Sequence, residues 1–173
     1  METETQPKKT RLGSAFVAFV LKRLPQDTAF GAALRRADNP DTEYQSWEHL
    51  APWCDLDDSF KRVCFATVGA GLANSKQSSE GPASLGSAIA RCYSDGNQDD
   101  SAKRKLRRLL ACETSTEACH WVRPMLRLAG SRGVQVNFGR LLDDLLFFGP
   151  KVKERWATDF YGKKGEKDDS IGA

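Results

Sequence analysis

Apolar residues recur at helical spacing along almost the whole chain, and this pattern predicts the fold. In the first segment they fall three and four positions apart, at Leu12, Phe16, Phe19, Val20 and Leu24. Such spacing places them on one face of a helix, which Pro25 ends. Alternation typical of a strand is confined to 133–137, which is short enough to be an extended connector. We therefore predict an all-α fold, a helical bundle of about eight helices.

Polar and turn-forming residues divide this pattern into separate helices. Asp27 and Asn137 stand where helix N-caps are expected, directly before apolar segments. Thr114-x-x-Glu117 fits a capping box. Pro124 lies inside the helix that this box would start, so we expect either a kink at Pro124 or a later start.

Two polar segments, 74–82 and 94–100, interrupt the helices, and we expect 74–82 to be the most mobile part of the chain. The helices on either side of these segments are predicted to form two small lobes. The charged C-terminal end has the composition of a disordered segment. The predicted organisation is a flexible N-terminus at 1–10, an N-terminal helical lobe at 11–92, a C-terminal helical lobe at 101–161 and a disordered tail at 162–173.

Composition indicates a cytoplasmic protein. No apolar run approaches the length of a membrane span, and the N-terminus lacks the basic start and apolar middle of a signal peptide. The cysteines are odd in number, without a CxxC pair, and are expected to be reduced and structural, several of them buried: Cys54, Cys64, Cys92, Cys112 and Cys119. We predict no metal site and no cofactor.

The sequence gives little support to an enzyme. It contains only two histidines, His49 and His120, and its acidic pairs, such as Asp143-Asp144, are adjacent in sequence. Adjacent side chains on a helix point about 100° apart, so no such pair forms a two-metal cage by itself. We therefore predict no catalytic residues.

Charge is unevenly distributed along the chain. Residues 1–100 carry 11 Lys/Arg and 14 Asp/Glu, whereas residues 101–140 carry 9 basic and 2 acidic side chains, a net charge of 9 − 2 = +7. Solvated helix faces usually mix the two signs. A concentration of one sign favours a polyanionic partner, and nucleic acid is the first candidate.

The segment 103–110 is the strongest candidate for a binding surface. On a helical wheel its leucines fall within about 100°, and Lys103, Arg104, Arg107 and Arg108 occupy an adjacent arc of about 140°. Arginine suits phosphate because its planar fork donates two hydrogen bonds. For Arg35 and Arg36 the helix dipole offers an alternative explanation. The predicted nucleic-acid-binding residues are Arg35, Arg36, Lys103, Arg104, Lys105, Arg107, Arg108, Arg123, Arg127 and Arg132.

The chain resembles the CasB family, the small subunit of the type I-E CRISPR Cascade surveillance complex. Four pieces over roughly 12–161 carry the resemblance, in this order: Ala33-Leu34-Arg35-Arg36, the basic-leucine stretch 104–110, Leu141-Leu142-Asp143-Asp144-Leu145, and Val152-x-x-x-Trp156-Ala157-x-Asp159-Phe160-Tyr161. The last piece is the most specific. Phe148 stands where the family pattern leads us to expect tryptophan.

The resemblance implies a fold of two small helical bundles and a role without catalysis. It implies that two copies lie side by side with other Cascade subunits on a guide RNA. There the basic surface accompanies the hybrid of guide RNA and target DNA and helps hold the displaced single strand. The family pattern covers Arg35, Arg36 and 104–108, whereas Arg123, Arg127 and Arg132 are candidates from charge alone. A helical scaffold for an acidic protein partner and a metal-dependent nuclease remain alternatives.

Overall fold

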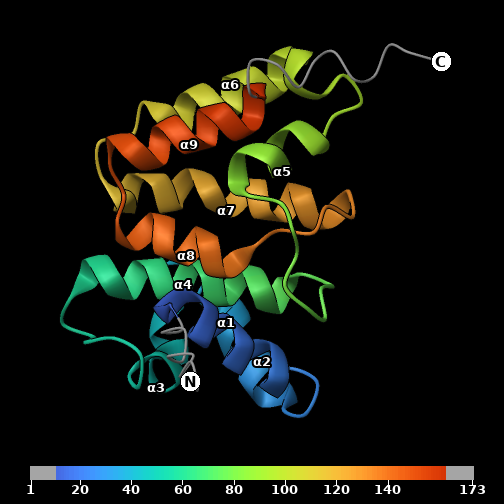
Figure 1. Cartoon of the computed structure of the whole chain (residues 1–173). Helices are drawn as coiled ribbons and strands as arrows, with labels where there is room; N and C mark the ends of the chain where they lie inside the picture. The colour runs from blue at the N-terminus through green and yellow to red at the C-terminus, as the bar shows by residue number, and fades with distance from the viewer. Residues whose placement is uncertain (1–10, 163–173) are drawn as a thin grey trace, which may run out of the picture.

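The structure is a computed structural model that describes residues 11–162. In that range the chain forms nine α-helices and two short 3₁₀ helices, with no strand (Figure 1). The all-α bundle of about eight helices is thus confirmed. The α-helices are α1 (Leu12–Arg23), α2 (Thr28–Arg36), α3 (Trp47–Leu50), α4 (Ser59–Asn74), α5 (Leu85–Arg91), α6 (Asp100–Leu110), α7 (Ser115–Ser131), α8 (Phe138–Leu146) and α9 (Pro150–Tyr161); the 3₁₀ helices are η1 (Glu43–Ser46) and η2 (Gly96–Gln98).

The three predicted N-caps are confirmed, because each side chain bonds a backbone amide in the first turn of its helix. The Asp27 carboxylate accepts a hydrogen bond from the Phe30 amide at 2.9 Å, and Asn137 accepts one from the Arg140 amide at 3.0 Å. Thr114 Oγ1 accepts from the amide of Glu117 at 3.2 Å. These bonds satisfy amides that have no partner within their own helix, which fixes the helix starts.

Helix α7 runs without interruption through Pro124, so the alternative of a later start is wrong. Its start is fixed by the Thr114 cap, and its buried side packs along α4. Pro124 itself is exposed. Packing on both sides of the proline therefore outweighs the backbone hydrogen bond that proline cannot make.

Helices α4 and α7 pack against each other near the middle of the bundle. In Figure 1, α2 and α3 lie at the bottom, and α5, α6 and α9 lie at the top. Helix α8 packs against α1 and α4, and α5 packs against α9. One hydrophobic core runs through these layers and includes Phe16, Phe65, Leu106 and Trp156.

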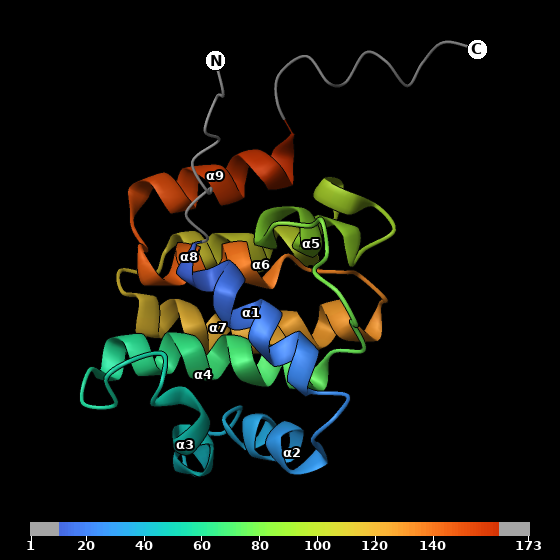
Figure 2. The ribbon, with the colours of Figure 1, turned by 60° about the horizontal axis from the view of Figure 1, so that its bottom comes forward.

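The division into lobes at 11–92 and 101–161 stays a prediction. The contacts of α1 with α8 and of α5 with α9 both cross that division (Figure 2). The expected flexible ends, 1–10 and 162–173, lie outside the described residues except for Gly162.

Two glycines allow helices to approach closely. A Cβ at Gly13 on α1 would overlap the carbonyl oxygen of Gly139 on α8. A Cβ at Gly86 on α5 would overlap the carbonyl oxygen of Trp156 on α9. Only a residue without a side chain lets these backbones meet, so both helix pairs depend on glycine.

The polar loop 74–82, expected to be the most mobile segment, is fixed by side-chain hydrogen bonds. Gln77 donates to the Val136 carbonyl at 3.0 Å and accepts from the Val136 amide at 2.7 Å. Glu80 accepts from the amides of Phe138 at 2.6 Å and Gly139 at 2.9 Å. The side-chain amide of Gln77 thus forms two hydrogen bonds with the backbone of the extended connector at 133–137, as a neighbouring strand would.

The cysteines are free thiols, of which four are buried and Cys54 is partly exposed, as expected of structural cysteines. In the described part of the chain, no group of three His, Cys, Asp or Glu residues is placed to hold a metal ion. Within residues 11–162, no helix combines the length and apolar character needed to cross a bilayer.

Candidate nucleic-acid interface

Helix α6 carries the main candidate surface. An N-cap and a buried apolar side hold this helix in place. The carboxylate of Asp99 accepts hydrogen bonds from the amides of Ser101 at 2.7 Å and Ala102 at 3.0 Å. Leu106 and Leu109 are fully buried, and the helix packs on α5, α7 and α9. The leucine arc predicted from the sequence therefore anchors α6.

The opposite side of α6 presents cations to solvent. Arg104, Arg107 and Arg108 are exposed, and Lys103 is partly exposed. We call these four residues the basic α6 surface. None of them makes an ion pair within residues 11–162. Four neighbouring cations without an ion pair repel one another, and an approaching anion relieves that repulsion.

Arg108 contacts an aromatic side chain, which the sequence analysis did not predict. Its guanidinium lies 4.8 Å from the ring centroid of Trp121 on α7. A stacked guanidinium keeps its charge and its outer N–H groups available while its orientation is fixed. Arg104 is positioned by a 2.9 Å hydrogen bond to the Ser101 hydroxyl. Two cations of the basic α6 surface are thus held by neighbouring side chains.

Lys105 on α6 lines a small apolar pocket together with Cys92, and Arg132 is the C-cap residue of α7. Burial raises the pKa of the Cys92 thiol, and the positive charges of Arg132 and Lys105 partly oppose this rise. Both cations therefore lie near Cys92, in the region where α5, α6 and α7 meet.

The remaining candidates gather around the end of α2. Arg127 makes an ion pair with Asp38 at 2.6 Å, and Arg123 donates weakly to the Ala37 carbonyl at 3.5 Å. Arg35 donates to the Ala73 carbonyl at 3.1 Å, and Arg36 donates to the side chain of Gln45. Figure 1 places α2 and α6 at opposite ends of the bundle. The ten candidates therefore do not form one continuous patch.

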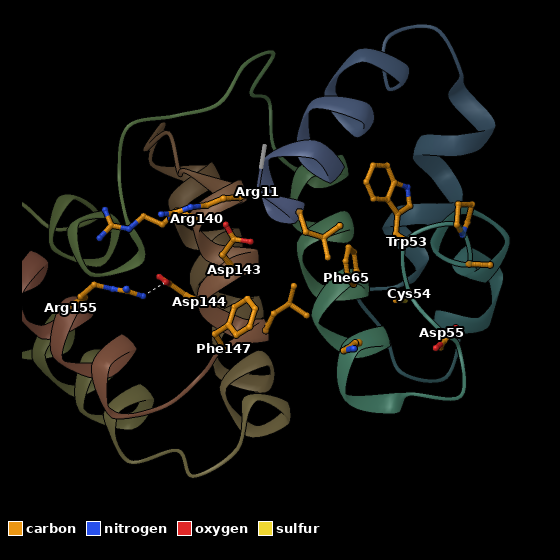
Figure 3. A pocket seen from close by; sticks show the side chains of 15 residues that line it. Arg11, Trp53, Cys54, Asp55, Phe65, Arg140, Asp143, Asp144, Phe147 and Arg155 are labelled. Atoms are coloured by element: carbon orange, nitrogen blue, oxygen red, sulfur yellow. Dashed lines mark hydrogen bonds and ion pairs between the residues drawn. The ribbon is translucent and has the colours of Figure 1, made fainter. Parts of the chain in front are cut away.

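A wider groove lies elsewhere, where the start of α1, residues 51–55 and helices α8 and α9 meet (Figure 3). Its volume is about 840 Å³, and its lining includes Arg11, Asp143 and Asp144. Phe147 also lines the groove, with 79% of its surface exposed. The acidic pair makes this groove the place to look for nuclease chemistry.

Two of the three acids in the lining, the adjacent Asp143 and Asp144, hold helices together, and Asp55 is the third. Asp143 Oδ1 accepts a 3.0 Å hydrogen bond from the Gly13 amide at the start of α1. Asp144 is buried and accepts from the Trp156 indole at 2.9 Å and from Arg155 (Figure 3). Burial raises the pKa of Asp144, and the hydrogen bond from Trp156 partly opposes that rise. Both carboxylates of α8 thus have structural partners, Asp143 in α1 and Asp144 in α9.

Comparison with families of known proteins gives a match over most of the chain. Residues 31–161 match the family model described as CRISPR-associated protein Cse2. Comparison with curated protein sequences finds no significant match.

Several solved structures share the fold. A chain of a CRISPR RNA-guided surveillance complex is 25% identical, with a TM-score of 0.69 over 87% of this chain and 91% of that chain. CasB of M. ruber is 25% identical, with a TM-score of 0.70 over 88% and 94%. CasB of Thermus thermophilus is 26% identical, with a TM-score of 0.67 over 89% and 100%.

These matches agree with the resemblance found in the sequence. The family match begins at Gly31, before the Arg35-Arg36 pair, and ends at Tyr161, the last residue of the Trp156 motif. The structural matches extend to nearly the full length of the solved CasB chains. The chain therefore belongs to the Cse2 (CasB) family of CRISPR-associated proteins, the small subunits of the type I-E Cascade complex.

Proposed function

We propose that this protein is a non-catalytic, nucleic-acid-binding subunit of a type I-E Cascade complex that stabilises the R-loop. Its family supports the place in the complex. The observation that carries the binding role is the basic α6 surface, in which Lys103, Arg104, Arg107 and Arg108 have no ion pair within residues 11–162. A polyanion supplies the charges that these side chains lack.

Phosphate is the ligand that fits this surface best. Arginine donates paired hydrogen bonds to phosphate oxygens, and the stack of Arg108 on Trp121 fixes the orientation of one such fork. Contacts of this kind are made to the backbone, so they add affinity without choosing a sequence. This property suits a subunit that must accept any guide and any target.

R-loop formation makes modest contacts effective. The guide–target hybrid is about as stable as the DNA duplex that it replaces, so backbone contacts from protein tip the balance. In this proposal the protein works in the cytoplasm beside other Cascade subunits and a second copy of itself. Its ligands are the guide RNA, the target DNA and the displaced single strand.

The test is the lifetime of an R-loop in an assembled complex. Replacing Arg104 and Arg108 with glutamate should shorten that lifetime while the subunit still assembles. The charge-matched control is Lys22→Glu with Lys61→Glu, since both lysines are exposed and lie on α1 and α4. An unchanged lifetime in an assembled Arg104/Arg108 complex would overturn the proposal and favour a scaffold that meets an acidic protein.

A further inference from the structure

A groove between α4 and α7 carries positive charge outside the basic α6 surface. It is lined by the second halves of these two helices and has a volume of about 370 Å³. Three cations face it: Lys76, Arg123 and Arg127. Asp38 is the single acid in its lining. The lining therefore carries a net charge of 3 − 1 = +2.

The hydrogen bonding of Arg123 is incomplete. Its Nε atom is buried and has no hydrogen-bond partner in the described structure. Within residues 11–162, the guanidinium of Arg123 makes one hydrogen bond, from Nη2 to the Ala37 carbonyl at 3.5 Å, which is at the long limit for such a bond. A buried donor without an acceptor costs free energy, so this guanidinium would gain from an anion.

The neighbouring side chains complete an anion site. Arg127 lies one turn after Arg123 on α7, and like charges at this spacing repel each other. Asp38 pairs with Arg127 and with no other cation within residues 11–162. Thr67, Ser75 and Ser131 also line the groove, but each of their hydroxyls donates to a carbonyl oxygen of the preceding helical turn. The donors left for an anion are therefore the guanidinium groups and the ammonium group of Lys76, and such cationic donors hold a phosphate.

We infer that this groove, the α4–α7 groove, binds a single phosphate group through Arg123, Arg127 and Lys76. The site rests on the proposed function only for the source of the phosphate, which is either the backbone of a nucleic acid or a free phosphate ion. Lys76 enters the site from the loop after α4, 47 positions before Arg123 (123 − 76 = 47). No spacing in the sequence relates the two residues, and only the packing of α4 on α7 brings them together.

The first experiment titrates inorganic phosphate into the full-length, ¹⁵N-labelled protein and follows the Nε–Hε resonances of its arginines. The resonance of Arg123 should shift and saturate, and the shift should disappear in Lys76→Gln. A single-stranded DNA 12-mer without terminal phosphates should compete for the same site. Saturation by phosphate without competition by the DNA would keep the site and assign it to free phosphate. A resonance unmoved by both ligands would overturn the site.

The second experiment measures the affinity of the 12-mer for variants of the groove. Arg123→Gln should lower affinity about tenfold at low salt and reduce the salt slope by about 0.7, the value of one phosphate contact in a single strand. The control is Lys22→Gln, an exposed cation on α1. Lys76→Gln serves as the second variant if Arg123→Gln does not fold.

The outcomes separate this inference from the proposed function. If both groove variants bind normally and the Arg104/Arg108 glutamate variant binds weakly, the groove is not a nucleic-acid contact, and the proposed function stands. Normal binding by all of these variants would overturn the proposed function as well.

Discussion

Trp156 on α9 donates its indole N–H to the buried carboxylate of Asp144 on α8, with 2.9 Å between Nε1 and Oδ2. Trp156 is fully buried, and Asp144 is 4% exposed. The bond joins the two sequence motifs at 141–145 and 152–161 that carry the family resemblance. Their joint occurrence thus has a physical reason, because each motif supplies the polar partner that the other needs in the core.

Replacing Asp144 with alanine should destabilise the protein by about 2–3 kcal/mol, since a buried indole N–H loses its acceptor. Asp144→Asn keeps one acceptor oxygen and should cost less. Chemical denaturation measures both. Asp159→Asn is the matched control, because Asp159 pairs with Arg140 near the surface and such pairs contribute about 0–1 kcal/mol. Equal losses for Asp144→Ala and Asp159→Asn would contradict this account.

The same carboxylate should make stability depend on pH. Burial raises the pKa of Asp144 above its ordinary value of 3.8, so the folded protein binds this proton more tightly than the unfolded chain does. The contribution to stability is complete below pH 3.8 and is lost as pH rises through the higher pKa of the folded state. The free energy of unfolding of the wild type, minus that of Asp144→Asn, should fall as pH rises. A difference that grows with pH would show that Trp156 and Arg155 lower the pKa of Asp144 by more than burial raises it.

Two glycine substitutions should have opposite effects. Gly86→Ala places a methyl group against the carbonyl oxygen of Trp156, so α5 and α9 must separate, at a cost of about 1–3 kcal/mol. Gly130→Ala on α7 meets nothing within 4 Å and should be neutral or stabilise by up to about 1 kcal/mol, because alanine favours helix. Thermal melting of the two variants compares them directly. A Gly86→Ala protein as stable as the wild type would refute the close packing.

The protein should not cleave DNA with Mg²⁺ or Mn²⁺. Asp143 holds the start of α1, and Asp144 holds Trp156 and Arg155. Incubation of single-stranded and duplex DNA with each metal, followed by gel analysis, tests the prediction. Cleavage that disappears on replacing Asp143 with asparagine would reveal a catalytic site.

Much of the fold can be predicted from local patterns. Asp27, Thr114 and Asn137 cap the helices that follow them because a cap needs only a nearby amide. Pro124 shows the limit of such reasoning. Its cost is local, but the packing of α7 on α4 that overcomes this cost comes from residues distant in the sequence.

The candidate sites show the same division. The four cations of the basic α6 surface share one helix, so helical spacing alone predicts that they face outward together. Arg123 and Lys76 share a groove only because α4 packs on α7. Arg35 and Arg108 carry the same charge, but the fold places their helices at opposite ends of the bundle (Figure 1).

The central claim is tested most directly by binding of single-stranded nucleic acid to the isolated protein at several salt concentrations. If the basic α6 surface contacts about three phosphates, log affinity should fall with log salt at a slope near −2. Arg104→Glu with Arg108→Glu should flatten this slope and weaken binding to all sequences alike.

Melting curves serve as the control for folding, because Arg108 also stacks on Trp121 and losing that contact costs about 0.5–1 kcal/mol. Arg104→Glu with Arg107→Glu leaves the stack in place and should weaken binding in the same way. Lower affinity and a flatter slope in folded variants are the predicted result. Wild-type affinity and slope in a folded Arg104/Arg108 variant would contradict the account.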